Sequence, residues 1–305
     1  MKLKLNILLN MENKDFAVFI LTHGRPDNVK TLSTLKKCGY TGKIYFIVDN
    51  EDKTIEQYQK NYGIENVKIF DKKAMADEVD EGNNFDERRT ITHARNACFK
   101  IAKEIGTTYF VQLDDDYTAF EWRYESKDGK KLKVHKITNL DKIMELHLDF
   151  YKKTNFKSIA FAQGGDFIGG VENPTVKKRP LMRKCMNSFF CSTEREFKFI
   201  GAMNEDVNTY TTLGSRGELF GTIPMISLTQ TATQSNKSGI TDMYQRFGTY
   251  CKAFTTAMMH PSGAKVSMMN STHQRIHHTI KWLNTTPMIL DERFKKSESV
   301  NQGMV

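Results

Sequence analysis

Short apolar runs alternate with amphipathic stretches over the first 120 residues of the chain. The apolar runs have the length of buried strands, and in the stretches between them apolar residues recur at helical spacing, as Ile91, Ala94, Cys98 and Ile101 do. The pattern predicts strands at residues 16–22, 43–50, 66–71 and 108–113, and helices at 25–39, 54–63 and 86–106.

This alternation of strand and helix predicts an α/β fold with a doubly wound, mostly parallel sheet and helices on both faces. Beyond residue 120 the pattern loosens: 125–136 reads as an exposed basic hairpin or loop, 140–154 as an amphipathic helix and 158–165 as a strand. Without a repeat or a clear linker, we expect one continuous domain with an elaborated second half.

Polar side chains follow three of the predicted strands, at residues 22–25, 49–50 and 114–116. Ligands of doubly wound sheets bind beyond the carboxyl ends of the strands, so these groups are expected to share one edge. Asp114 and Asp116 stand two residues apart and could both reach one Mg²⁺ or Mn²⁺ ion, since these cations prefer carboxylate and phosphate oxygens. The alternative is a solvated acidic turn.

Candidate chemistry also lies on the predicted helix that precedes the aspartates. Arg95, with Arg88 and Arg89 upstream, could face a diphosphate, because a guanidinium suits phosphate oxygens in a bidentate manner. A solvated helix face explains any one of these arginines equally well.

Two later segments carry further candidates. Glu205 or Asp206 could act as a general base toward an acceptor hydroxyl. Alternatively, Asn204 or Asp206 could simply cap a helix. His277 and His278 are adjacent, so one of them could point inward and complete a metal site, although surface histidines are commoner.

The amino-acid composition indicates the kind of binding partner, but it does not indicate which reaction the protein catalyses. The 305 residues include 39% hydrophobic and 27% charged side chains, as in ordinary globular proteins, and the net charge of +9 suggests an acidic partner such as nucleic acid or a phosphate-rich substrate. The five cysteines contain no C-x-x-C pair, which argues against a disulfide framework. With neither a membrane-length apolar run nor a signal cleavage site, we expect an intracellular protein, with Met11 as an alternative start.

Taken together, these motifs resemble the GT-A-fold glycosyltransferases. The segments that carry the resemblance, in the order and roughly the spacing of that class, are LTHGRPDN, IVDNED, THARNACFKIAKEIG, QLDDDY and NEDVN. More narrowly, the chain is similar to the phage TET-associated glycosyltransferases, which add sugar to hydroxymethylated pyrimidines in DNA. The later segments SGITDMYQRFGTYCKAFTTAMMHPSGAKVSMM and RIHHTIKW resemble the same group.

The resemblance implies a GT-A-like domain with a nucleotide-sugar half at 16–120, an acceptor-side half at 121–290 and a tail at 291–305. It implies an acceptor-side base at Glu205 or Asp206 and a metal shell completed by His277 or His278. The nucleotide and metal residues that it implies are Thr22, His23, Arg25, Asp49, Arg95, Asp114, Asp115 and Asp116.

The activity implied is metal-dependent transfer of a sugar from a UDP-sugar to a hydroxymethylpyrimidine in double-stranded phage DNA, in the cytoplasm of the infected host. A protein or glycan acceptor is an alternative. So are a sugar nucleotidyltransferase, a metal-dependent nuclease or phosphohydrolase, and a DNA-binding protein without catalysis. Segments 125–136 and 176–184 supply lysines and arginines that could grip a DNA backbone, or they are solvated loops.

Overall fold

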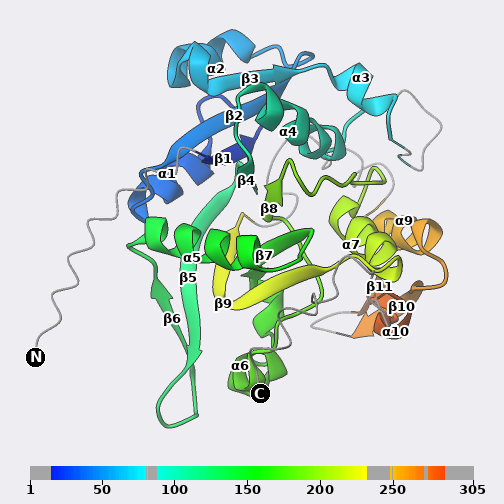
Figure 1. Cartoon of the computed structure of the whole chain (residues 1–305). Coiled ribbons are helices and arrows are strands. Elements are labelled where there is room, and N and C mark those ends of the chain that lie inside the picture. The colour runs from blue at the N-terminus through cyan, green and yellow to red at the C-terminus, as the bar shows by residue number, and fades with distance from the viewer. Residues whose placement is uncertain are drawn as a thin grey trace, which may run out of the picture.

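A computed structural model describes residues 15–79, 81, 88–231, 248, 250–270 and 274–285 of the chain. The strands in this part of the chain (Figure 1) are β1 (Phe16–Leu21), β2 (Lys43–Asp49), β3 (Val67–Phe70), β4 (Tyr109–Asp114), β5 (Tyr117–Glu125), β6 (Leu132–Lys136), β7 (Ser158–Gln163), β8 (Phe189–Ser192), β9 (Phe220–Gln230), β10 (Ala264–Asn270) and β11 (Gln274–Ile280).

The α-helices that the structure describes connect and cover these strands. They are α1 (Lys30–Lys37), α2 (Ile55–Tyr62), α3 (Lys72–Ala76), α4 (Thr92–Glu104), α5 (Leu140–Lys153), α6 (Pro174–Lys178), α7 (Glu205–Ser215), α9 (Cys251–Met259) and α10 (Trp282–Thr285), with 3₁₀ turns at Ile64–Asn66, Gly164–Phe167 and Gly170–Glu172.

One sheet of nine strands, in the order β3-β2-β1-β4-β8-β7-β9-β5-β6, forms the centre of the described structure. The pairs β1–β2, β1–β4, β2–β3 and β7–β9 are parallel, whereas β8 and β5 run against their neighbours. Strands β10 and β11 form a separate antiparallel hairpin. The mostly parallel α/β sheet predicted from the alternating pattern is therefore confirmed.

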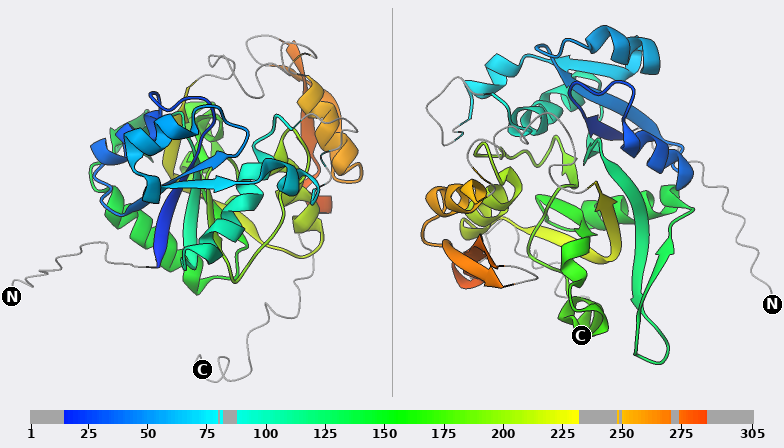
Figure 2. Two further views of the ribbon diagram at one scale, coloured as in Figure 1. Left: turned by 90° about the horizontal axis from the view of Figure 1, so that it is seen from above. Right: turned by 180° about the vertical axis from the view of Figure 1, so that it is seen from behind.

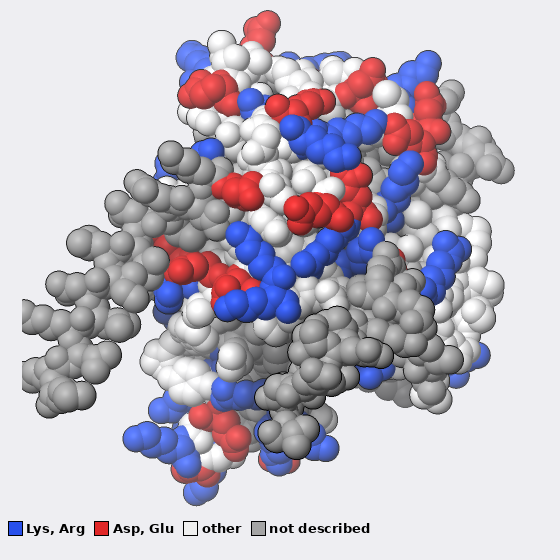
Figure 3. All heavy atoms as spheres, viewed as in Figure 1, with Lys and Arg blue, Asp and Glu red and all other residues white. Residues whose placement is uncertain are grey.

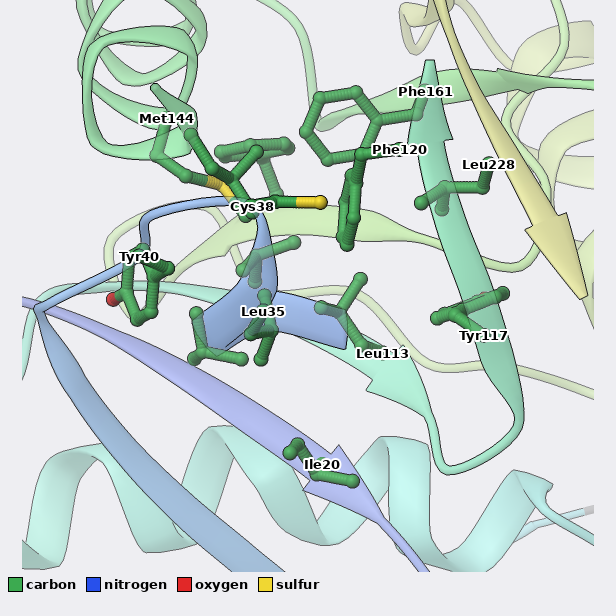
Figure 4. Packing of buried hydrophobic residues seen from close by; sticks show 14 of the residues in the cluster. Ile20, Leu35, Cys38, Tyr40, Leu113, Tyr117, Phe120, Met144, Phe161 and Leu228 are labelled. Atoms are coloured by element: carbon green, nitrogen blue, oxygen red, sulfur yellow. The ribbon is translucent and has the colours of Figure 1, made fainter. Parts of the chain in front are cut away.

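Both faces of the sheet are buried around β1. Its even-numbered residues pack in one core cluster with Leu35 of α1 and Met144 of α5, and its odd-numbered residues pack in a second cluster with Ile101 of α4. Because successive side chains of a strand point to opposite faces, a continuous apolar run can fill both. Figure 2 shows helices on both sides of the sheet, and Figure 4 shows the first cluster from close by.

The predicted elements differ from the observed ones mainly at helix starts. The helix predicted from residue 25 begins at Lys30, and the one predicted from residue 86 begins at Thr92, because the preceding residues form loops at the carboxyl end of the sheet. Residues 125–136 belong to a β5–β6 hairpin. The five cysteines, all of them among the described residues, form no disulfide, as expected. The alternative start at Met11 and the tail at 291–305 lie outside the described residues.

No helix among the described residues combines the length and the apolar character that crossing a bilayer requires.

Candidate active site

A cavity of about 1050 Å³ lies at the carboxyl end of the parallel strands. Its walls come from the residues after β1, β2 and β4, from the first turn of α7 and from β11. This volume is at the upper end of the range for small-molecule sites, so a ligand as large as a nucleotide-sugar is a reasonable occupant. The residues predicted from the sequence that line it are Thr22, His23, Arg25, Asp49, Arg95, Asp114, Asp115, Asp116, Glu205, Asp206, His277 and His278.

Asp115 fixes the loop that follows β1. Its Oδ2 accepts a hydrogen bond from the Thr22 hydroxyl at 2.7 Å, and its Oδ1 accepts one from Arg25 Nη1 at 2.8 Å. The Thr22 hydroxyl is also 2.8 Å from the hydroxyl of Tyr58. Burial raises the pKa of Asp115, and the nearby Arg25 opposes that rise. Asp115 therefore faces inward and holds Thr22 and Arg25 at the cavity wall.

The end of β2 carries a second polar cluster. His23 Nδ1 lies 2.6 Å from Asp49 Oδ2, and Lys72 Nζ lies 3.4 Å from Asp49 Oδ1. The hydrogen bond to Asp49 raises the pKa of His23, although partial burial works against it. Gly24, at φ +67°, turns its N–H toward Asp52 Oδ2 at 2.7 Å, a conformation that glycine adopts without strain. His23 stays half-exposed and can meet a ligand from the cavity mouth.

Arg95 occupies the centre of the site. Helix α4 is docked by the Thr92 hydroxyl, which donates to the Gly201 carbonyl at 2.7 Å, so that Arg95 one turn later points under the cavity. Its Nη2 donates to Asp114 Oδ1 at 2.9 Å and its Nε donates to Glu205 Oε1 at 2.8 Å. Arg95 therefore links the aspartate at the end of β4 to the acid that opens α7.

Arg95 is almost completely buried and lies against aromatic rings. The side chain is 1% exposed, and its guanidinium carbon lies 4.8 Å from the ring centroid of Phe189. Burial alone would lower the pKa of Arg95, but the carboxylates of Asp114 and Glu205 raise it above its usual range. Its Nη1 is buried and has no hydrogen-bond partner among the described residues. A substrate oxygen at this nitrogen would satisfy it.

Two carboxyl groups beside Arg95 titrate near neutral pH. Burial raises the pKa of Asp114 to about 6. Burial and the neighbouring carboxylate of Glu205 raise the pKa of Asp206 to about 7. Groups with strongly raised pKa values in a cavity are typical of functional sites. Glu205 is held by Arg95, so Asp206 is the better placed of the two acids to accept a proton.

Asn204 joins α7 to the C-terminal elements of the cavity wall. It precedes α7 in the left-handed region at φ +53°, which asparagine tolerates better than most residues. Its Nδ2 donates to the Lys252 carbonyl at 2.8 Å and to the Thr256 hydroxyl at 3.0 Å, and lies 3.4 Å from His278 Nδ1. The predicted cap at Asn204 is thus an anchor for α9, and its side chain makes no cap bond to α7.

The two histidines on β11 sit side by side, with ring centroids 4.3 Å apart. Burial lowers the pKa of His277, and burial together with His277 and Lys252 lowers the pKa of His278 to about 4. Both rings are therefore neutral at pH 7, the form in which histidine binds metals.

The residues predicted as metal ligands share the cavity without forming a closed cage. Among the described residues, no three His, Cys, Asp or Glu side chains come together as a ready-made metal site. Asp114 and Asp116 nevertheless line the same cavity. This donor set fits Mg²⁺ or Mn²⁺ bound by one or two carboxylates, with substrate phosphates and water as the other ligands.

Some cavity residues carried no recognisable signal in the sequence. Lys72 and Arg275 are single cations in otherwise unremarkable segments, and Trp282 lies in a short helix near the end of the described chain. Lys72 could have been recognised as a candidate because it directly follows the third predicted strand, at residues 66–71.

A mostly parallel α/β sheet with a carboxylate-rich cavity at its carboxyl edge is the architecture of the GT-A glycosyltransferases. The chain belongs to the TET-associated glycosyltransferase family, whose sequence profile matches residues 16–239. It is therefore a glycosyltransferase. None of the curated proteins matches it in sequence.

Solved structures with a related arrangement are only distantly similar. Glucosyl-3-phosphoglycerate synthase from Mycobacterium tuberculosis, in complex with Mn²⁺, UDP and phosphoglyceric acid, is 10% identical, with 87% of this chain and 86% of that chain covered at a TM-score of 0.42. TarS 1–349 of S. aureus, in complex with UDP-GlcNAc, is 11% identical, with 79% of this chain and 66% of that chain covered at a TM-score of 0.41.

Proposed function

We propose that this glycosyltransferase moves a sugar from a UDP-sugar to the hydroxyl group of a hydroxymethylated pyrimidine in double-stranded phage DNA, with a divalent cation, in the cytoplasm of the infected host. The observation that carries the proposal is the convergence of carboxylates from three places, β2, β4 and α7, on one cavity, with Arg95 joining the last two. The family membership and the net charge of +9 favour DNA as the acceptor.

The donor is assigned to the wall formed by the ends of β1, β2 and β4. Thr22, His23 and Arg25 would contact the nucleotide, and Asp49 its uracil or ribose. Asp114 and Asp116 would hold the divalent cation, which stabilises negative charge on the departing diphosphate. His277 or His278, both neutral, would add a ligand from the opposite wall.

The acceptor is assigned to the side of α7. The acceptor oxygen attacks the anomeric carbon, the bond between sugar and phosphate breaks, and the nucleoside diphosphate leaves with that electron pair. Asp206 takes the hydroxyl proton, since a base with a pKa near the working pH is effective. A single displacement of this kind inverts the anomeric centre. The hydrogen bonds of Arg95 to Glu205 and to Asp114 hold the start of α7 in place relative to the end of β4, where the donor is proposed to bind.

We further propose that residues 16–120 and 121–290 are the donor and acceptor halves of one domain. Strand β4 of the first half pairs with β8 of the second within the nine-stranded sheet. A cavity walled by both halves fits a reaction in which each half contributes one substrate.

The test is mass spectrometry of nucleosides after incubation of the protein with Mn²⁺, a panel of UDP-sugars and either unmodified or hydroxymethylated duplex DNA. A hexose or pentose added only to hydroxymethylated pyrimidines, and lost with EDTA, is the expected result. Transfer of sugar to a protein or glycan instead would agree with the enzyme class but would show that the proposed DNA acceptor is wrong. Formation of a nucleotide-sugar from a sugar phosphate would favour the nucleotidyltransferase alternative, and DNA cleavage without donor would favour a nuclease.

A further inference from the structure

Two segments that are distant in the sequence each carry a net excess of positive charge. Residues 121–136 contain six Lys or Arg and three Asp or Glu, and residues 166–184 contain five Lys or Arg and two Asp or Glu. Together these 35 residues carry a net charge of +6, and the whole chain carries +9. Because the excess is so uneven, it is unlike the mixed surface that solubility alone requires.

An apolar cluster holds the two segments together. Phe167 and Val176 are buried, and Leu132 of β6 and Met182 pack against them. The guanidinium carbon of Arg123 in β5 lies 5.6 Å from the ring centroid of Phe167. The β5–β6 hairpin is thus held against α6 and its flanking residues close to the hairpin turn. Figure 1 shows the hairpin projecting past the rest of the sheet, with α6 beside it.

The lysines at the end of the hairpin face solvent. Lys127, Lys130, Lys131 and Lys133 are exposed, and so are Lys177 and Arg179 at α6. Figure 3 shows Lys and Arg side chains, with fewer acidic ones between them, at the lower end of the molecule, where the hairpin projects.

This surface starts at the cavity. Asp116 lines the cavity and directly precedes β5, while Gly165 and Lys184, on the two sides of α6, line it as well. The nine residues of β5 span about 30 Å, which equals the length of about nine base pairs of B-DNA.

We infer that the β5–β6 hairpin and the α6 segment form a phosphate-binding track for the duplex that carries the acceptor base, on one side of that base. The inference rests on the proposed DNA acceptor. The inference specifies which part of the duplex the protein contacts outside the active site. The track requires about nine base pairs of duplex on one side of the modified base and none on the other side.

The first test measures binding without catalysis. A 24-base-pair fluorescent duplex with one central hydroxymethylated pyrimidine is titrated with the protein at several NaCl concentrations. The test variant is Lys127→Ala/Lys130→Ala/Lys131→Ala, and the matched control is Lys53→Ala/Lys60→Ala/Lys73→Ala, which removes three exposed lysines outside the track. Each lost phosphate contact lowers the salt slope by about one, so the test variant should lose about two to three and bind at least tenfold more weakly.

The second test uses the direction of the track. Two duplexes carry the modified base three base pairs from one end or from the other. One of them should bind the wild-type protein at least tenfold more weakly than the central duplex, and the test variant should show little difference between the two. Equal binding of all three duplexes, or equal salt slopes for test and control variants, would overturn the track.

Competition experiments distinguish duplex DNA from other polyanions as the ligand of the track. The nucleoside assay then distinguishes failure of the track from failure of the proposed activity. Equal competition by duplex RNA or polyglutamate would overturn the assignment to duplex DNA. The nucleoside assay is read separately. If wild type binds DNA as expected but transfers no sugar to it, the proposed activity fails and the track stands. If it transfers sugar while both variants bind alike, the track fails and the activity stands.

Discussion

Replacing Asp206 with Asn separates the role of this residue in transfer from its effect on stability. The pKa of Asp206 is about 7 in the folded protein, against 3.8 for an unperturbed aspartate. The folded state therefore holds a proton that the unfolded state has already lost, and stability falls as pH rises from about 4 through 7. Asn cannot titrate, so this part of the pH dependence disappears in the variant.

The size of the effect follows from the two pKa values. Between pH 6 and pH 8 the wild-type protein should lose about 1.4 kcal/mol through Asp206, and Asp206→Asn should not lose it. For a chain of 305 residues this corresponds to about 2 °C in melting temperature. Melts recorded at both pH values with EDTA measure it. Transfer to hydroxymethylated DNA should fall about 10²- to 10⁴-fold, because the base is lost.

Glu205→Gln is the matched control at the neighbouring position. Glu205 accepts from Arg95 in a buried pair, so its loss leaves part of the guanidinium uncompensated and should lower stability at both pH values. The two variants should thus shift stability at pH 8 in opposite directions. If Asp206→Asn keeps most of its transfer activity, or if its melting temperature depends on pH as that of the wild type does, the assignment of Asp206 as the base is wrong.

Variants at three further positions test other parts of the site. Arg95→Met should cost about 3–5 kcal/mol in urea unfolding, more at pH 8 than at pH 6, because Asp114 and Glu205 are left buried without their cation, whereas Arg95→Lys should recover part of it. Asp116→Ala should abolish Mn²⁺-dependent transfer with a nearly unchanged melting temperature, and full activity there would exclude its role at the metal. Asn204→Ala should be about 1 kcal/mol less stable than Asn204→Gly, since both lose the bonds to α9 but only alanine is strained at φ +53°; equal unfolding free energies would contradict this.

The sequence predicted the parallel half of the fold well because periodicity is a local signal. Strands β1, β2 and β4 lie where the apolar runs placed them, and the polar groups after them meet at one edge because parallel strands end there together. The start of α1 was missed because Gly24 and Arg25 are drawn into contacts with Asp52 and Asp115, which no local pattern encodes.

The second half was harder to predict because its elements depend on distant partners. The segment around His277 and His278 is a strand only through its pairing with β10. The contact between Arg95 and Glu205 joins residues 110 positions apart, and no spacing rule connects them. Their side chains could be selected as candidates by residue type, but their mutual geometry could not.

The bridge through Arg95 has a consequence for how the two substrates are coordinated. Asp114 and Glu205 share the positive charge of one buried guanidinium, that of Arg95. A cation bound by Asp114 would weaken the pairing of Asp114 with Arg95, so Arg95 would pair more strongly with Glu205. When Glu205 is more tightly paired with Arg95, its carboxylate stabilises a proton on Asp206 less, because that carboxylate is one of the causes that raise the pKa of Asp206. Donor binding with a cation at Asp114 would thereby lower the pKa of Asp206 and prepare it to accept the hydroxyl proton. The pH profile of transfer should then rise at a lower pH than the metal-free pKa of about 7, and Arg95→Lys, whose single ammonium cannot bridge in the same way, should shift that rise upward.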